Sequence, residues 1–363
     1  MHENALRERS AGLDLLRSLC MLMVVILHLL GRGGVMAAAV PFTPNYHLTW
    51  LWESAAYCAV DCYALLTGYL SVRSRFRPAP LLQLWLQVFC YSAGITALFA
   101  LFYEQVSPLR FLQACLPVTF TQYWYFTAYF ALYCFAPFFN RLIAVLSRDA
   151  FRRLLTTGFI LLSVIPTVSG ADPFVTGDGY SFLWLAALYF GGAYLRLYPP
   201  RTHGSLRWLG GYGLCVLALL VFRTVTERIT FALTGAVAHG GWILTYTSPV
   251  VLGAAVCLLL CGRDLQPSAA CRRVIAFFTP VSFGVYLFHT QPFVFHRLLN
   301  GAAVPLLELP AWLFAIAVPA AAAAIFLTGA AVDHVRRLAF RLLRIPQLTE
   351  RLGARLERIL PEI

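Results

Sequence analysis

The chain has 363 residues, of which 60% are hydrophobic and only 12% are charged, and its mean hydropathy is +0.72. This composition excludes an ordinary soluble protein and indicates an integral membrane protein. The net charge is +12, and all of the positive charge comes from arginine because the chain contains no lysine. We interpret this charge as a topology signal rather than a nucleic-acid surface.

Apolar segments of about 17 to 25 residues recur along the chain, each long enough to cross the hydrocarbon core of a bilayer. They predict an all-α integral membrane protein, a bundle of about ten transmembrane helices, in the bacterial inner membrane. The predicted spans are 13–30, 50–70, 81–103, 121–139, 154–171, 180–196, 206–222, 241–261, 274–296 and 311–332.

The arginines are distributed unevenly over the loops between these spans. With the N-terminus placed in the cytoplasm, all but five of the 28 basic residues fall on the cytoplasmic side. This asymmetry follows the positive-inside rule and predicts that both termini are cytoplasmic. The five arginines predicted outside are Arg32, Arg110, Arg223, Arg228 and Arg297. We predict a membrane domain over residues 1–335, followed by an Arg-rich interfacial helix or tail over residues 336–363.

The first span contains two residues that lipid disfavours, Arg17 and His28. They are eleven residues apart, close to three helical turns, so both project from one helix face with about 16 Å of rise between them. Asp14 is placed for an ion pair with Arg17 that would orient the guanidinium. Arg17 alone could instead reach the inner headgroups, and His28 could bond a neighbouring helix, but buried ionisable groups usually face a cavity or a partner.

The second span carries three polar residues, Glu53, Tyr57 and Asp61, at intervals of four residues. In one continuous helix they would form a single stripe. Asp61, near the middle of the membrane, could pair with a histidine or arginine and orient a general base, or could relay protons in a transporter.

A second membrane histidine, His289, lies about fifteen residues into its outward-running span, as His28 does in its own. The two imidazoles are therefore predicted to share a depth in the membrane. Gln291 follows, and Pro280 and Pro292 free backbone carbonyls that could line a polar pocket. A purely structural hydrogen-bonding role for His289 stays open.

The ten cysteines lie almost all in or beside apolar spans, without a CxxC pair or a histidine cluster. We interpret them as small buried hydrophobic residues and predict no metal site.

Four motifs in chain order resemble the acyltransferase-3 family of integral-membrane acyltransferases, which modify bacterial surface carbohydrates. The most specific is an opening Arg-x10-His, met by Arg17 and His28 with Asp14 upstream. "CYALLTGYL" (62–70) resembles the end of the family's second span, with Tyr63 and Thr67 as mild departures, and an arginine loop follows it. The others are "YWYFTAYFALYCFAPFFN" (123–140) and "SFGVYLFH" (282–289). The resemblance extends over essentially the whole chain.

The resemblance implies acyl transfer from cytoplasmic acyl-CoA to a hydroxyl of a surface or exported glycan. Acetyl-CoA is the expected donor substrate, succinyl-CoA being an alternative, and glycan-assembly proteins are possible partners besides the lipid bilayer. We expect Arg17 and the loop arginines to hold the CoA phosphates, because a guanidinium donates bidentate hydrogen bonds to phosphate. The loop arginines are Arg73, Arg75 and Arg77.

His28 would act as general base on the acceptor hydroxyl, or would itself accept the acyl group. Asp61 or Glu53 would orient it, and His289 would bind the acceptor or assist proton transfer. The expected substrate-binding residues are Glu53, Tyr57, Trp124 and Tyr125.

An alternative from another class is a proton-coupled transporter or flippase of a polysaccharide or small polar substrate. Buried Asp, Glu and His residues would serve proton coupling, but we find no clear inverted repeat of the kind many transporters carry. A non-catalytic scaffold is a third reading, and it would not need to bear the burial cost of Arg17 and His28.

Overall fold

The computed structural model describes residues 11–202 and 204–359, which are helical in the main and contain no strand, as predicted. Seven helical segments in this part of the chain are long and apolar enough to cross a membrane. They are α1 (Ala11–Gly31), α5 (Pro78–Phe102), α7 (Trp124–Val145), α8 (Arg148–Phe159) continued through η2 (Ile160–Val164) into α9 (Ile165–Ser169), α11 (Ser205–Thr234), α13 (Ala269–Phe278) continued through η4 (Thr279–Val281) into α14 (Ser282–His289), and α15 (Ala311–Leu342).

The number of long spans is smaller than the ten predicted, and the segment 50–70 accounts for one difference. The expectation of one helix there is wrong, because α3 (Pro44–Ala56) and α4 (Ala59–Ser71) are separate. Pro44 in the first turn and the Thr43 side chain, which accepts a bond from the Tyr46 N–H, start α3 before the apolar run. The break falls between them, at residues 57 and 58.

Two other predicted spans correspond to helices of only 16 residues, α10 (Phe182–Leu197) and α12 (Pro249–Asp264). The remaining elements are short apart from the C-terminal helix. They are α2 (Val35–Ala38), α6 (Pro108–Cys115), η3 (Gly177–Gly179), η5 (Val294–Leu298), η6 (Val304–Glu308) and α16 (Ile345–Ile359).

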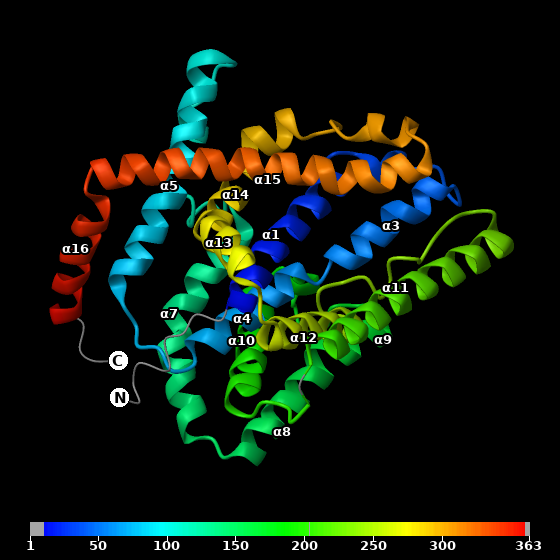
Figure 1. The fold of residues 1–363 in the computed structure, drawn as a ribbon, viewed down its shortest axis with the longest axis horizontal. Helices are drawn as coiled ribbons and strands as arrows, with labels where there is room; N and C mark the ends of the chain where they lie inside the picture. Colours follow the sequence, from blue (N-terminus) through cyan, green and yellow to red (C-terminus); the bar gives the residue numbers. More distant parts are fainter. Residues whose placement is uncertain (1–10, 203, 360–363) are drawn as a thin grey trace.

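Helix α1 occupies the middle of the molecule, in contact with α3, α4, α12, α14 and α15 (Figure 1). Beside it, α4 and α10 pack with almost no space between their backbones. A Cβ atom added to Gly68 of α4 would lie 2.0 Å from the Tyr189 carbonyl oxygen, and one added to Gly192 of α10 would lie 1.9 Å from that of Leu65. Small residues permit such close helix contacts in membranes.

Helix α15 continues ten residues beyond the predicted end of its span, so the expected domain boundary at 335/336 falls inside it. Asp333 makes this possible, because its fully buried carboxylate pairs with Arg336 at 2.8 Å. It also accepts hydrogen bonds from Gln87 (3.2 Å) and Tyr91 (3.0 Å) of α5. A buried charge satisfied in this way can remain within a packed helix.

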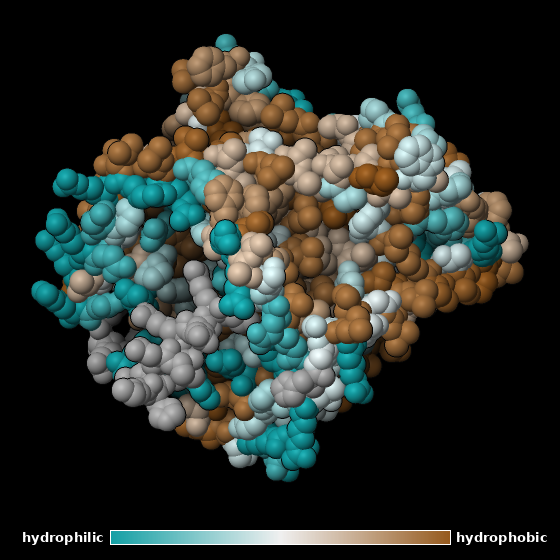
Figure 2. Space-filling view, viewed as in Figure 1, coloured by the Kyte–Doolittle hydropathy of each residue, from teal (hydrophilic) through white to brown (hydrophobic). Residues whose placement is uncertain are grey.

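The tail helix α16 packs against the start of α5 (Figure 1). A Cβ atom on Gly353 would lie 2.6 Å from the Cβ of Ala79, and Glu350 pairs with Arg77 at 3.2 Å. Hydrophilic atoms gather over this part of the molecule, while apolar atoms dominate the surface along α15 (Figure 2). The polar end of the molecule therefore includes α16 and the loop that precedes α5.

Candidate active site

A cavity of about 420 Å³ lies between α1, α4, α7 and α14, within the size range of small-molecule sites. The α1 residues that line it are spaced three, four or one apart, which places them on one face of the helix. They are Arg17, Met21, Val24, Leu27 and His28. As the spacing predicted, the guanidinium and the imidazole face one space, three turns apart.

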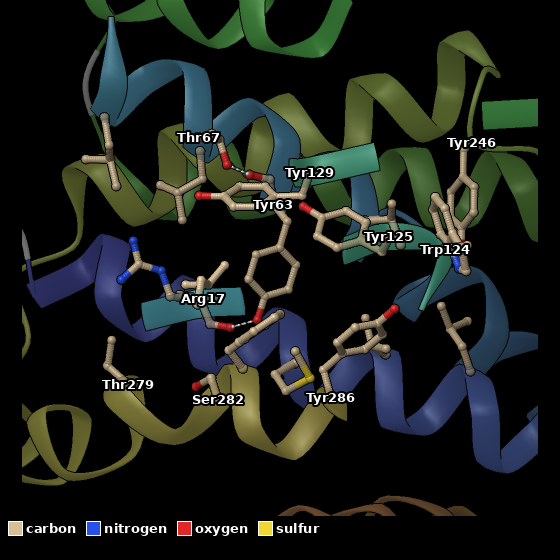
Figure 3. A pocket seen from close by; sticks show the side chains of 18 of the residues that line it. Arg17, Tyr63, Thr67, Trp124, Tyr125, Tyr129, Tyr246, Thr279, Ser282 and Tyr286 are labelled. Carbon is tan, nitrogen blue, oxygen red and sulfur yellow. Dashed lines mark hydrogen bonds between the residues drawn. The ribbon is translucent and has the colours of Figure 1, made fainter. Parts of the chain in front are cut away.

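At one end of this reaction cavity, Arg17 is held by two interactions. Its Nη1 pairs with Asp14 at 3.2 Å, the predicted ion pair, and its backbone carbonyl accepts a hydrogen bond from the Tyr63 hydroxyl at 2.6 Å. The hydroxyls of Thr279 and Ser282 belong to the same end (Figure 3). Because the side chain is still 28% exposed, the guanidinium is open to an anionic ligand.

Three helical turns from Arg17, the imidazoles of His28 and His289 are in direct contact. Nδ1 of His28 lies 2.9 Å from Nε2 of His289, and Nδ1 of His289 lies 2.6 Å from the Val285 carbonyl oxygen. His289 is 1% exposed, and the rings of Phe295 and His28 pack edge to face. The equal depths predicted from the sequence therefore correspond to a hydrogen-bonded pair.

The hydrogen-bond chain assigns the tautomers of a neutral pair. A carbonyl oxygen only accepts, so the proton of His289 is on Nδ1 and its Nε2 is an acceptor. His28 must then donate from Nδ1, which leaves the lone pair on its Nε2. A histidine that lines the cavity and keeps one unprotonated ring nitrogen can act as a base or as a nucleophile.

Neither carboxylate that was expected to orient His28 reaches it. Asp61 is fully buried on α4 and accepts a hydrogen bond from the indole N–H of Trp184 in α10, at 3.0 Å. Glu53 is 6% exposed on α3, and its Oε2 has no hydrogen-bond partner within the described residues. Because the chain breaks between α3 and α4, the predicted stripe does not form, and His289 takes the place next to His28.

The three loop arginines, Arg73, Arg75 and Arg77, lie exposed between α4 and α5. None of them lines the reaction cavity, and Arg77 pairs with Glu350 of the tail. The loop nevertheless starts at the cavity, because Ser71 forms part of its wall.

Of the expected substrate-binding residues, Trp124 and Tyr125 line the cavity. Tyr57 does not, but its ring stacks at 4.8 Å on Tyr246, which does. Trp124 and Tyr246 lie at the end opposite Arg17 (Figure 3).

Further tyrosines in the wall were not singled out from the sequence. Tyr129 follows Tyr125 by one helical turn, and Tyr286 precedes His289 by nearly one turn, so spacing could have found both. Tyr180 and Tyr246 come from irregular segments, where no period exists to mark them. The wall thus offers aromatic surface with hydroxyl groups, which suits a ligand that is partly apolar and partly polar.

The acyltransferase-3 family, described as an acyltransferase domain, matches residues 10–330 of the chain. No curated protein and no solved structure matches it. The match covers nearly the whole chain and agrees with the seven apolar helices in the described residues. The chain therefore belongs to the acyltransferase-3 family and is a multi-pass membrane acyltransferase.

Proposed function

We propose that this acyltransferase moves an acetyl group from cytoplasmic acetyl-CoA to a hydroxyl of a surface or exported polysaccharide, in the bacterial inner membrane. The observation that carries the proposal is the reaction cavity, in which Arg17 and the unprotonated nitrogen of His28 occupy one helix face. A proton-coupled transporter could use the same imidazole nitrogen, but the guanidinium on the same face suits the phosphates of a CoA donor.

Arg17 holds the phosphates of the donor in this proposal. Its guanidinium offers the planar donor pair that phosphate accepts, and Asp14 keeps it in place. The pantetheine arm then follows α1 for about 16 Å, the rise of eleven helical residues, and brings the thioester to His28. The loop arginines supply positive charge where the donor enters.

His28 acts as the general base of the transfer. Its Nε2 takes the proton of the acceptor hydroxyl while the oxygen forms a bond to the thioester carbonyl carbon. The carbon–sulfur bond breaks, and the leaving thiolate takes the proton from His28, giving an ester and free CoA. His289 holds the ring throughout, because its Nε2 accepts the Nδ1–H of both the neutral and the protonated form. The apolar side chains of Met21, Val24 and Leu27 limit water near the thioester.

The test uses the purified protein in lipid vesicles with labelled acetyl-CoA and an oligosaccharide. Label in the oligosaccharide as a base-labile ester supports the proposal. Passage of unmodified oligosaccharide across the vesicle membrane, with no ester formed, contradicts it and favours the transporter. If label is retained on the protein before acceptor is added, the role of His28 as a general base is replaced by that of an acylated intermediate.

Replacing Arg17 by alanine is expected to raise the KM for acetyl-CoA about ten- to a hundredfold, because charge-assisted hydrogen bonds to phosphate are lost. The measurement is steady-state kinetics with the donor varied. Arg207→Ala, which removes an exposed arginine that does not line the cavity, is the matched control and should leave this KM unchanged. An unchanged KM in the Arg17 variant would remove the phosphate role.

His289→Phe is expected to lower kcat roughly 10- to 100-fold, the usual cost of losing a partner that orients a functional histidine. His289→Gln keeps a side-chain oxygen that can accept the His28 N–H, so it should recover much of the rate. The pH profile of kcat should also change in the Phe variant and less in the Gln variant. Equal rates and profiles in both variants would show that acceptance of this bond is irrelevant.

A further inference from the structure

A second cavity, of about 660 Å³, lies on the side of the molecule predicted to face outward. Its lining is unusually basic for that side, because three of the five arginines predicted outside belong to it or lie directly behind it. Arg110 and Arg297 line this outer cavity together with His296, and Arg32 bonds His296. Arginine is generally kept away from outer loops, so this concentration calls for a function.

A hydrogen bond with Arg32 orients the His296 ring. Nη2 of Arg32 lies 2.5 Å from Nδ1 of His296, and Nε of Arg32 donates to the Phe295 carbonyl oxygen at 3.3 Å. Because a guanidinium only donates, Nδ1 of His296 accepts and the ring proton is on Nε2. Partial burial, and then the charges of Arg32, Arg110 and Arg297, lower the pKa of His296. The neutral ring is thus a hydrogen-bond donor among cations.

The positive charge is only partly neutralised. Glu104 pairs with Arg297 at 2.7 Å, and Arg110 has no acidic partner within the residues the structure describes. The guanidinium groups of Arg32, Arg110 and Arg297 are therefore balanced by only one paired carboxylate, that of Glu104, among the described residues. Uncharged polar side chains add further hydrogen-bonding groups to the lining, beside Pro292 and Phe293. They are Thr96, Gln113, Thr121 and Gln122.

Two segments of the chain connect the outer cavity to the reaction site. Thr121 and Gln122 line the outer one, while Trp124 and Tyr125, two residues further on, line the reaction cavity. Thr121 has a φ of +48°, a left-handed conformation that a β-branched residue rarely adopts and that often occurs at functional sites.

The second connecting segment is the one after α14. Phe295 contacts the His28 ring, with 5.2 Å between ring centroids, and the next residue is His296. The segment of Phe295 and His296 therefore connects the outer cavity to the histidine pair.

We propose that the outer cavity binds an anionic group of the acceptor, a carboxylate or phosphate carried by the glycan. Two guanidiniums and an imidazole N–H form charge-assisted hydrogen bonds with such an oxyanion. A neutral glycan has no anionic group to accept these hydrogen bonds. This selection of acidic acceptors rests on the proposed function. Anionic lipid headgroups have the same chemistry, and the experiment separates the two sources.

The experiment measures binding without any donor, with the full chain in discs of phosphatidylcholine. The probe is a fluorescent tetrasaccharide that contains glucuronate, compared with its carboxyl-reduced form. The variant Arg110→Gln/Arg297→Gln is compared with Arg228→Gln, which removes an arginine that stacks on Phe42 and does not line the cavity.

We expect the acidic probe to bind the unmodified chain and the Arg228 variant alike, and to bind the double variant at least about tenfold more weakly. The carboxyl-reduced probe should bind all three weakly. The proposal would be overturned if the acidic probe bound the double variant as tightly as the unmodified chain. It would also be overturned if the reduced probe bound the unmodified chain as tightly as the acidic probe does. Complete displacement of the probe by phosphatidylglycerol in the discs would overturn it too, because the site would then belong to lipid.

Two further measurements keep the result interpretable. Thermal unfolding of each variant checks folding, and the single substitution Arg110→Gln repeats the test at an exposed residue. Because no donor is present, the binding result is independent of ester formation. If the acidic probe binds as expected but no ester forms, the proposed function is contradicted and this inference is not. If ester forms but the acidic probe binds the variants as tightly as the unmodified chain, this inference is contradicted and the proposed function is not.

Discussion

Replacing His28 by alanine is expected to lower ester formation by about 10²- to 10⁴-fold, the range that a general base contributes. The substitution removes the cavity-lining imidazole and its free Nε2, and it leaves His289 without its hydrogen-bond donor. The measurement is the initial rate of label transfer from acetyl-CoA to the oligosaccharide, at saturating donor.

Two variants separate loss of the base from loss of structure. His28→Asn keeps an N–H that can donate to His289 but lacks the basic nitrogen, so it should be as inactive as the alanine variant. His47→Ala removes a histidine outside the reaction cavity and should keep its rate. If His28→Asn retained nearly full activity, proton transfer at Nε2 would have to be abandoned.

Replacing Gly192 by alanine is expected to destabilise the protein by about 3 kcal/mol or more, because the added methyl group meets backbone that cannot move aside. Its Cβ would lie 1.9 Å from the Leu65 carbonyl oxygen, so α4 and α10 would have to separate. Since α4 carries Tyr63, Thr67 and Ser71 in the cavity wall, activity should fall with the folded fraction. Thermal unfolding and gel filtration in detergent measure the effect.

The matched control is expected to change stability in the opposite direction. Gly213 lies within α11, and a Cβ atom there would meet nothing within 4 Å. Gly213→Ala should therefore stabilise the helix by up to about 1 kcal/mol, through the better helix propensity of alanine. Equal stability of the two variants would show that the close contact of α4 and α10 is not rigid.

The part of the site that could be predicted from the sequence depends on regular helix geometry within single spans. Arg17 and His28 share a face because eleven residues nearly complete three turns, and no tertiary contact changes that. The contact of His28 with His289 agrees with the equal depths predicted from their equal positions in two spans predicted to run outward. The ion pair of Asp14 with Arg17 follows from local spacing in the same way.

The rest of the site depends on irregular backbone and on helix rotation, for which hydropathy gives no signal. Residues 57 and 58, at the break between α3 and α4, include no proline or glycine, so the sequence gives no signal for the break. The break is the reason that the expected stripe of polar residues does not form. Asp61 could be recognised as costly to bury, but its partner Trp184 depends on the rotation of α10 against α4. Tyrosines of irregular segments, such as Tyr180, also line the cavity, and a periodic pattern cannot identify them.

The length of α15 also escaped prediction, for an energetic reason. Asp333 and Arg336 look like the end of a membrane span when each charge is counted alone, as a hydropathy window does. In the fold, ion pairing and the bonds from Gln87 and Tyr91 compensate the buried carboxylate. Hydropathy counts residues singly, whereas the cost of burying a charge depends on its partners.

The docking of α16 on α5 restricts the loop that lies beside the reaction cavity. The loop of residues 72–77 joins Ser71, in the cavity wall, to the start of α5, where Gly353 of the tail packs on Ala79. A short connection fixed at both ends cannot swing outward as a hinged flap, since its reach is set by a few residues of extended chain. In the proposed mechanism a docked tail keeps this loop in place beside the cavity, and undocking the tail would free the loop to move.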